Sequence, residues 1–165
     1  MIRFARRYIQ QSFRDELRTF LGEYGWLDGS AVPAAGAFEM KERAPKPSDM
    51  ETTGENTIYV SFGDEPDVRP LQLGGGLLRT ERVFFVDVVA ERESVGDMLA
   101  GEVKDRLTGL FGGTRYLRPV DPQGAALPGY LVEFTDVAMR QAEGERRTWF
   151  VVDGTLQIDF PGSDD

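Results

Sequence analysis

Hydrophobic residues follow two different periods along this chain, and the clearest change of period falls within residues 82–112. Apolar and aromatic residues fill residues 82–90, and because successive side chains of a strand point to opposite faces, such a strand is apolar on both sides. One face carries Val83, Phe85 and Val89, and the other carries Phe84, Val86, Val88 and Ala90. From Val95 to Leu110 the apolar positions instead recur every three or four residues. The pattern predicts a buried strand that leads directly into an amphipathic helix.

Two helices are expected. The second spans residues 94–110, with Ser94 as its N-cap and Gly112 and Gly113 at its end. The first spans residues 2–22, where aromatic and aliphatic residues recur at a spacing of three to five with Arg and Gln between them. The apolar stripes of both helices are expected to pack in the core.

The remaining apolar runs predict further strands, of which the one with Pro70 would lie at an edge of the sheet. These strands cover residues 57–62, 68–73, 114–120, 130–139, 147–152 and 155–160, with a tight turn at Asp153-Gly154. Because the strands cluster instead of alternating with helices, the fold class is α+β, a mostly antiparallel sheet flanked by two helices with long mobile loops.

The chain has the length of one domain, and residues 1–160 are expected to form it. Residues 28–56 lack a sustained period and contain three prolines, which indicates a long loop inserted in this domain. Residues 161–165 are polar and acidic and are expected to be a disordered tail.

Three consecutive glycines, Gly74, Gly75 and Gly76, invite comparison with a phosphate-binding loop. Such a loop needs Gly-Lys-Ser/Thr leading into a helix, whereas this triplet leads into a strand. We therefore expect the three glycines to form the flexible tip of a hairpin, which can serve as a docking loop.

The chain contains no histidine and no cysteine, which removes the commonest general base, thiol chemistry and the usual ligands of zinc. Asp87, Asp136 and Asp153 lie in or beside strands, but alternation along a strand already places polar side chains toward solvent. We expect no catalytic residues, no metal site and no cofactor, and hence no enzyme.

Charge is distributed unevenly. The chain carries a net charge of −9, whereas residues 1–24 hold five arginines and three acids, so the rest of the chain carries −11. An acidic protein is a poor match for phosphate-rich nucleic acid. The basic first helix, through Arg3, Arg6 and Arg7, is instead suited to an acidic neighbour, including a second copy, although a solvated helix face also accounts for these arginines.

Apolar residues on both faces of the strands raise the question of what covers the second face. Leaving several large apolar side chains in water is unfavourable, since each stabilises a protein by about 1.5–3 kcal/mol when buried. An interface between copies, or with a partner protein, formed by Phe84, Phe85, Val86 and Trp149 is one answer. Residues 28–56 folding back over the sheet are the other.

The order of the elements resembles that of neck proteins of long-tailed bacteriophages, most closely the tail terminator family. The resemblance is carried by the helix MIRFARRYIQQSFRDELRTFL, the strand RVFFVDVVAE, the helix SVGDMLAGEVKDRLTGLF and the closing strands YLVEFTDVAMRQ and RRTWFVVDGTLQIDF. It covers most of the chain outside residues 28–56. The family keeps architecture and size better than sequence, so no functional residue is carried over.

The resemblance implies a ring of six subunits that caps the tail-tube protein, stops its polymerisation and meets the connector or stopper protein of the head. DNA would pass through the ring without specific binding, and the protein would be part of the virion after assembly in the host cytoplasm. A head-completion or stopper protein and a tail-tube subunit are alternatives, as is a small ligand-binding regulatory α+β domain. No apolar run is long enough to span a membrane, and the charged start does not resemble a signal peptide.

Overall fold

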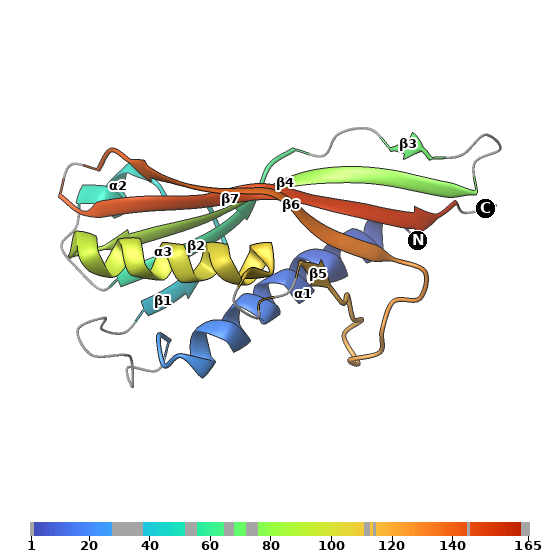
Figure 1. Cartoon of the computed structure of the whole chain (residues 1–165), viewed down its shortest axis with the longest axis horizontal. Coiled ribbons are helices and arrows are strands. Elements are labelled where there is room, and N and C mark those ends of the chain that lie inside the picture. Colours follow the sequence, from blue (N-terminus) through green and yellow to red (C-terminus); the bar gives the residue numbers. More distant parts are fainter. Residues whose placement is uncertain are drawn as a thin grey trace.

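A curled sheet of seven strands carries two long helices on one face (Figure 1). The computed structural model describes residues 2–27, 38–51, 56–64, 68–71, 76–110, 113, 115–144 and 146–162, with residues 2–4 described as backbone only. The elements are α1 (Ile2–Glu23), β1 (Phe38–Lys41), α2 (Pro47–Glu51), β2 (Asn56–Phe62), β3 (Arg69–Pro70), β4 (Leu77–Ala90), α3 (Glu93–Thr108), β5 (Tyr116–Leu117), β6 (Leu131–Ala142) and β7 (Thr148–Pro161). The predicted α+β class with a mostly antiparallel sheet is confirmed.

The order of strands in the sheet is β1-β2-β4-β7-β6-β5, and β3 pairs with the N-terminal end of β4. All pairs are antiparallel except β1 with β2, which run parallel. Strands β4 and β7 form the centre, paired along their whole length from Leu77 with Pro161 to Ala90 with Thr148. The apolar residues 82–90 are thus the second half of a longer strand that begins at Leu77, directly after the three glycines that were expected to lead into it.

The main core lies between the sheet and the helices α1 and α3 (Figure 1). Phe13 of α1 is fully buried, and its ring centroid lies 5.8 Å from Phe62 of β2, 5.1 Å from Phe84 of β4 and 5.4 Å from Phe134 of β6. The two helices are joined by an ion pair of 2.8 Å between Arg106 of α3 and Glu16 of α1. The aromatic stripe of α1 is thus core packing, as expected.

The second face of the sheet is covered over part of its area by the short helix α2, which lies on the side opposite α1 and α3 (Figure 1). Met50 of α2 packs with Tyr59 of β2, Val89 of β4 and Trp149 of β7 in a separate apolar cluster. Further along β7 the outward residues are polar: Asp153, Thr155, Gln157 and Asp159. The predicted fold-back of residues 28–56 over this face is observed for the segment from Arg43 to α2, whereas β1 instead extends the sheet at its edge.

Two local predictions are wrong. Residues 38–51, expected within a loop, form β1 and α2, and the rest of that predicted loop at 28–37 and 52–55 lies outside the described residues. The tight turn predicted at Asp153-Gly154 does not exist, because both residues lie inside β7. Gly154 is opposite Phe84, and a Cβ atom there would approach Phe84 Cζ to 2.9 Å. The glycine therefore makes room for a core ring.

The boundaries of the second helix also differ from the prediction. The helix begins at Glu93, after Arg92, and no side chain caps it, so Ser94 is not the N-cap. It ends at Thr108, where Gly109 adopts a left-handed φ of 76°. Glycine is favoured in that conformation, and it ends the helix before Gly112 and Gly113 are reached.

Candidate interaction surfaces

The predicted interface residues of β4 lie on different faces of the sheet. Phe84 and Val86 are fully buried beneath α1 and α3, and Phe85 lies on the opposite face, half-buried. An interface that includes Phe84 and Val86 is therefore wrong, because their side chains already fill the core of a single chain. Of this predicted pair of phenylalanines, only Phe85 is on the outer face.

Trp149, the fourth apolar residue assigned to the interface, is tied to a buried carboxylate. Its indole Nε1 donates a hydrogen bond of 2.9 Å to Oδ1 of Asp87, which is 5% exposed. Burial raises the pKa of Asp87 to about 6, against the opposing effects of the Trp149 hydrogen bond and of Arg140, and the nearby Asp153 raises it further. The outer face thus contains one carboxylate that is poorly solvated and close to Phe85.

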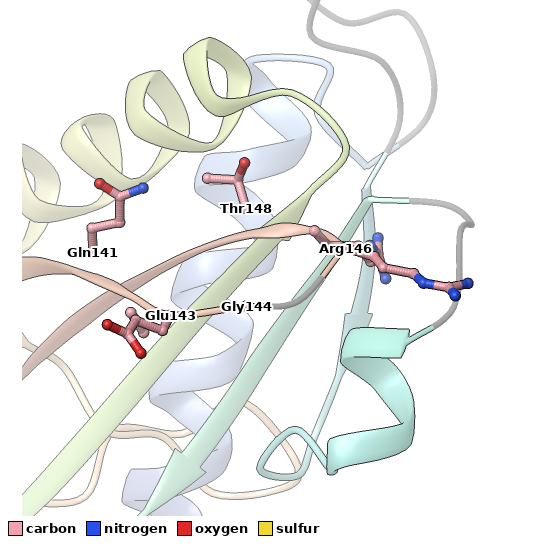
Figure 2. Close-up of a pocket in the computed structure, with 7 residues that line it drawn as sticks. Gln141, Glu143, Gly144, Arg146 and Thr148 are labelled. Atoms are coloured by element: carbon pink, nitrogen blue, oxygen red, sulfur yellow. The ribbon is translucent and has the colours of Figure 1, made fainter.

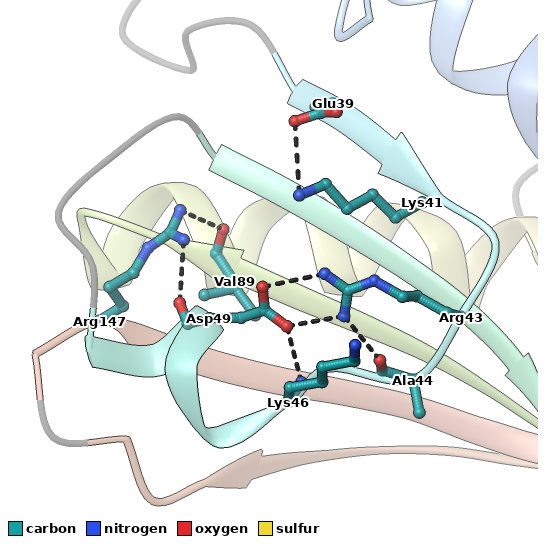
Figure 3. A network of polar contacts seen from close by, with 8 residues as sticks. All are labelled: Glu39, Lys41, Arg43, Ala44, Lys46, Asp49, Val89 and Arg147. Atoms are coloured by element: carbon teal, nitrogen blue, oxygen red, sulfur yellow. Dashed lines mark hydrogen bonds and ion pairs between the residues drawn. The ribbon is translucent and has the colours of Figure 1, made fainter.

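Helix α2 is held on the outer face by the network in Figure 3. The Arg43 guanidinium donates two hydrogen bonds, of 2.7 and 3.0 Å, to the carboxylate of Asp49, and the backbone N–H of Lys46 donates a third of 2.7 Å. The hydrogen bonds from Arg43 hold the pKa of Asp49 well below its usual value. Arg43 also lies 5.0 Å above the centroid of the Tyr59 ring, so the same cation fixes α2 and covers an aromatic residue of the sheet.

Arg147 links this network to the turn between β6 and β7 (Figure 3). The residue is 5% exposed, and its guanidinium donates to the backbone carbonyls of Asp49 and Val89, each at 3.4 Å. Its side chain, which directly precedes β7, thus bonds to main-chain carbonyls of both α2 and β4. Its role is to fix the position of α2.

A cavity of about 620 Å³ surrounds the turn between β6 and β7 (Figure 2). Its polar lining includes Gln141, Glu143 and Arg146, but Figure 2 shows Arg146 pointing away from the other two. Catalytic or ligand-binding side chains have to converge on one reacting or bound group. These side chains do not converge, so this cavity is not the candidate site.

The basic helix presents only part of its predicted arginine cluster to solvent. Arg7 is exposed and Arg6 is half-buried, whereas the side chain of Arg3 lies outside the described residues. Of the predicted docking loop, Gly76 is exposed just before β4, and Gly74 and Gly75 lie outside the described residues. Pro161 ends β7, and the predicted tail from residue 163 onward lies outside them too.

Contacts between subunits through sheet edges agree with the family resemblance, but the sequence did not indicate which strands form the two side edges of the sheet. Strand β1 forms one end of the strand order, and beyond the short β5 the other end is formed by residues 136–142 of β6. Among the residues that the structure describes, no further strand pairs with either edge. Open edges can accept a strand of another chain, so these are candidate interaction surfaces. The β1 edge was missed because its four residues lie between prolines and glycines that indicate a loop.

Within the described part of the chain, no group of three or more acidic side chains is arranged to hold a metal ion, and no helix has the length and apolarity needed to cross a membrane. Comparison of the chain with models of known protein families and with curated proteins gives no match.

Proposed function

We propose that this protein is a structural subunit that assembles into a ring, and that the ring acts as a tail terminator of a long-tailed phage. In this role it caps the tail tube, stops tube polymerisation and joins the tail to the head connector. The α+β architecture agrees with the resemblance of the sequence to that family. The observation that carries the proposal is the pair of open sheet edges, β1 and β6.

The two edges differ, and this difference favours a ring. A contact between unlike surfaces of identical subunits repeats head to tail, and it closes into a ring when the rotation per subunit allows. From the strand pairings, β1 and β6 run in opposite directions. If β6 of one subunit is placed beside β1 of the next, the new pair is therefore antiparallel, which is the commoner kind of strand pair.

Side-chain charge agrees with this contact. Glu39 of β1 pairs with Thr57 and lies on the outer face, and Arg140 of β6 pairs with Val151 on the same face. Glu39 and Arg140 are both exposed and carry opposite charges. Across a contact between β1 and β6 they lie on one face of the continued sheet, where an opposite-charge pair contributes about 0.2–1 kcal/mol.

The acidic character of the chain supports the passage of DNA through such a ring. With a net charge of −9, the protein repels the phosphate backbone, and repulsion limits sticking to a moving duplex. The tail-tube protein and the head connector are the partners at the two ends of the ring.

The proposal is tested first by the size of the purified protein, measured by light scattering after size exclusion, with negative-stain images of the same peak. Closed rings of about six subunits are expected on the family resemblance. Open filaments of indefinite length would favour a tube subunit over a terminator. A monomer that also fails to bind purified tail tubes would overturn the proposal.

The strand contact is tested separately by disulfide trapping, which is clean because the chain has no cysteine. The double variant Glu39→Cys/Arg140→Cys should form covalent ladders between subunits under mild oxidation. The control variant Glu39→Cys/Gln157→Cys places the second thiol on the same face but in the central strand β7, and should stay uncrosslinked. Equal ladders in both variants would show random collision and not edge pairing.

A further inference from the structure

A groove runs between α1 and the segment that follows β5, on the helix side of the molecule. It consists of two adjoining cavities of about 630 and 460 Å³ that share Ser12, Asp15 and Val120. One cavity extends along α1 to Arg7 and the other to Thr19. At the rise of an α-helix, the distance from Arg7 to Thr19 is about 18 Å, enough for about five residues of extended chain.

The floor of the groove is fixed. Ser12 is buried, and its hydroxyl makes two contacts with the backbone of Val120. The hydroxyl oxygen accepts a hydrogen bond of 3.0 Å from the Val120 N–H, and the hydroxyl donates to the Val120 carbonyl oxygen at 3.5 Å. This contact holds the segment after β5 against the helix. The space above it is therefore preformed and needs no rearrangement of the helix to bind a segment.

The carboxylates along the groove are already satisfied by neighbouring groups. Asp15 accepts from Gln11 at 2.9 Å, and Glu16 accepts from Arg106 at 2.8 Å. Asp121 Oδ1 accepts from the backbone N–H groups of Gln123 and Ala125, both at 2.9 Å. Glu16 is balanced by the positive charge of Arg106, and Asp15 also lies 3.5 Å from Arg18. Asp121 keeps its negative charge, because its hydrogen-bond donors are neutral N–H groups, so the two free arginines described next outnumber the one unbalanced acid of the groove.

Two arginines at the groove, Arg7 and Arg118, are exposed and make no hydrogen bond or ion pair with any residue that the structure describes. Tyr116 of the short strand β5 also borders the groove and is 53% exposed. It pairs with Glu133, which pairs with Gln157, so its side chain lies on the outer face beside the edge of β5. The edge of β5 that faces away from β6 pairs with no strand in the described part of the chain. Free cations therefore lie along the groove, and the open strand edge at its border carries an exposed aromatic ring on its outer face.

We propose that this groove binds a short, extended, acidic segment of a partner protein. Its carboxylates pair with Arg7 and Arg118, an apolar side chain packs on Tyr116, and its backbone pairs with the open edge of β5. Nucleic acid is a poorer match, because two free arginines neutralise few phosphates on a chain that is acidic as a whole. The proposal does not depend on the ring, since it uses neither β1 nor residues 136–142 of β6.

The test uses a fluorescein-labelled heptapeptide of alternating Glu and Phe, its matched Lys and Phe peptide, and a single-stranded oligonucleotide, each titrated against the full chain by fluorescence anisotropy. We expect saturable binding of the acidic peptide alone. The variant Arg7→Glu/Arg118→Glu should weaken it by about tenfold or more, since both attractive charge pairs with the peptide become repulsive. Shifts of the amide NMR signals of Tyr116 and Arg118 should accompany binding.

The matched control is Arg146→Glu, an exposed arginine at the turn between β6 and β7, outside the groove. It should bind the acidic peptide like the natural chain. Four outcomes would each overturn the proposal. The acidic peptide shows no saturable binding, or the Lys peptide binds equally well. The oligonucleotide binds with the same dependence on Arg7 and Arg118, or Arg146→Glu loses as much binding as the double variant. Light scattering of the same samples shows whether ring assembly changes, so the two proposals can fail separately.

Discussion

Trp149 of β7 and Asp87 of β4 form a hydrogen-bonded pair on the outer face of the sheet, with 2.9 Å between Nε1 and Oδ1. Asp87 is paired with Val151 in the strand register. It is two residues from Phe85 along β4, so the two side chains are neighbours on the same face. The indole N–H satisfies one oxygen of the carboxylate, but burial still disfavours its charged form. The pair therefore links the solvent-facing side of the sheet to the stability of the chain.

The first prediction concerns pH. The ordinary pKa of Asp87 is 3.8 and its folded value is about 6, so between these values the folded chain binds more protons than the unfolded one. Its contribution to stability is therefore present below pH 3.8 and is lost as the pH rises through about 6, a change of about 3 kcal/mol. The variant Asp87→Asn keeps an acceptor for Trp149 without the charge. It should be more stable than the natural chain at pH 7.5 and similar at pH 4, as measured by urea unfolding.

The control for this prediction is Glu102→Gln on α3, which removes a carboxylate that is not buried. It should leave the dependence of the unfolding midpoint on pH between 4 and 7.5 almost unchanged. If Asp87→Asn and the natural chain show the same dependence, Asp87 is not the group responsible.

The two neighbouring phenylalanines of β4 should respond very differently to substitution. Phe84 is fully buried against Phe13, with 5.1 Å between ring centroids, so Phe84→Ala should lower the free energy of unfolding by about 3–5 kcal/mol. Phe85 is half-buried on the outer face, and Phe85→Ala should lower it by about 1 kcal/mol. Phe85→Asp should remain folded, which circular dichroism checks. Equal losses for the two alanine variants would contradict the assignment of the faces.

Glycine substitutions test the packing of β7 against the core. A Cβ at Gly154 would lie 2.9 Å from Phe84 Cζ and 3.0 Å from the carbonyl oxygen of Thr135, so Gly154→Ala should destabilise the chain by about 1–3 kcal/mol. Gly101 lies inside α3 with no atom within 4 Å of such a Cβ. Gly101→Ala should therefore stabilise by about 0.5–1 kcal/mol through helix propensity. In thermal unfolding, the midpoint should fall for Gly154→Ala and rise for Gly101→Ala.

The network that holds α2 should respond to loss of Asp49. Asp49→Ala removes the three hydrogen bonds from Arg43 and Lys46, and we expect α2 to detach from the sheet at a cost of about 2 kcal/mol. Acrylamide quenching reports this, because Trp149 packs against the cluster of Met50, Tyr59 and Val89, whereas the other tryptophan, Trp26, is buried elsewhere. Quenching should rise in Asp49→Ala only.

The matched variant is Glu39→Ala, which removes an exposed ion pair of 3.9 Å with Lys41. It should change stability by less than about 0.5 kcal/mol. Since the pKa of Asp49 lies below 3.8, the stabilisation by the network is present above about pH 4 and is lost at lower pH. Unchanged quenching in Asp49→Ala would mean that α2 is held by its apolar contacts alone.

The periodic parts of the sequence predicted their structures well. The alternation through residues 82–90 and the helical spacing after Val95 are both set by burial of apolar side chains, which is the strongest local signal in a chain of this size. The alternation of side chains along the strand also correctly placed Phe84 and Phe85 on opposite faces of the sheet. Which face carries the helices is not encoded locally, since both faces of this strand are apolar, and it is decided by the contact of Phe84 with Phe13.

Residues 38–51 were not predictable as structure because their order comes from tertiary contacts. The four residues of β1 pair in parallel with β2, and α2 has a single buried apolar residue, Met50. At Gly154 a turn was predicted where the structure has a continuous strand. The dipeptide Asp-Gly commonly indicates a turn, but here the glycine makes room for Phe84. The open edges depend on the strand order, and no local pattern in the sequence gives that order.

The cluster around Phe13 has a consequence for how the protein is made. Phe13 lies near the N-terminus and packs on Phe134, which leaves the ribosome long after it. Until β6 has been synthesised, the apolar side of α1 cannot reach its final partners, and contacts between segments this distant in sequence form slowly. We therefore expect the nascent chain to expose this aromatic surface during translation, and to depend on chaperones that shield it when expression is fast.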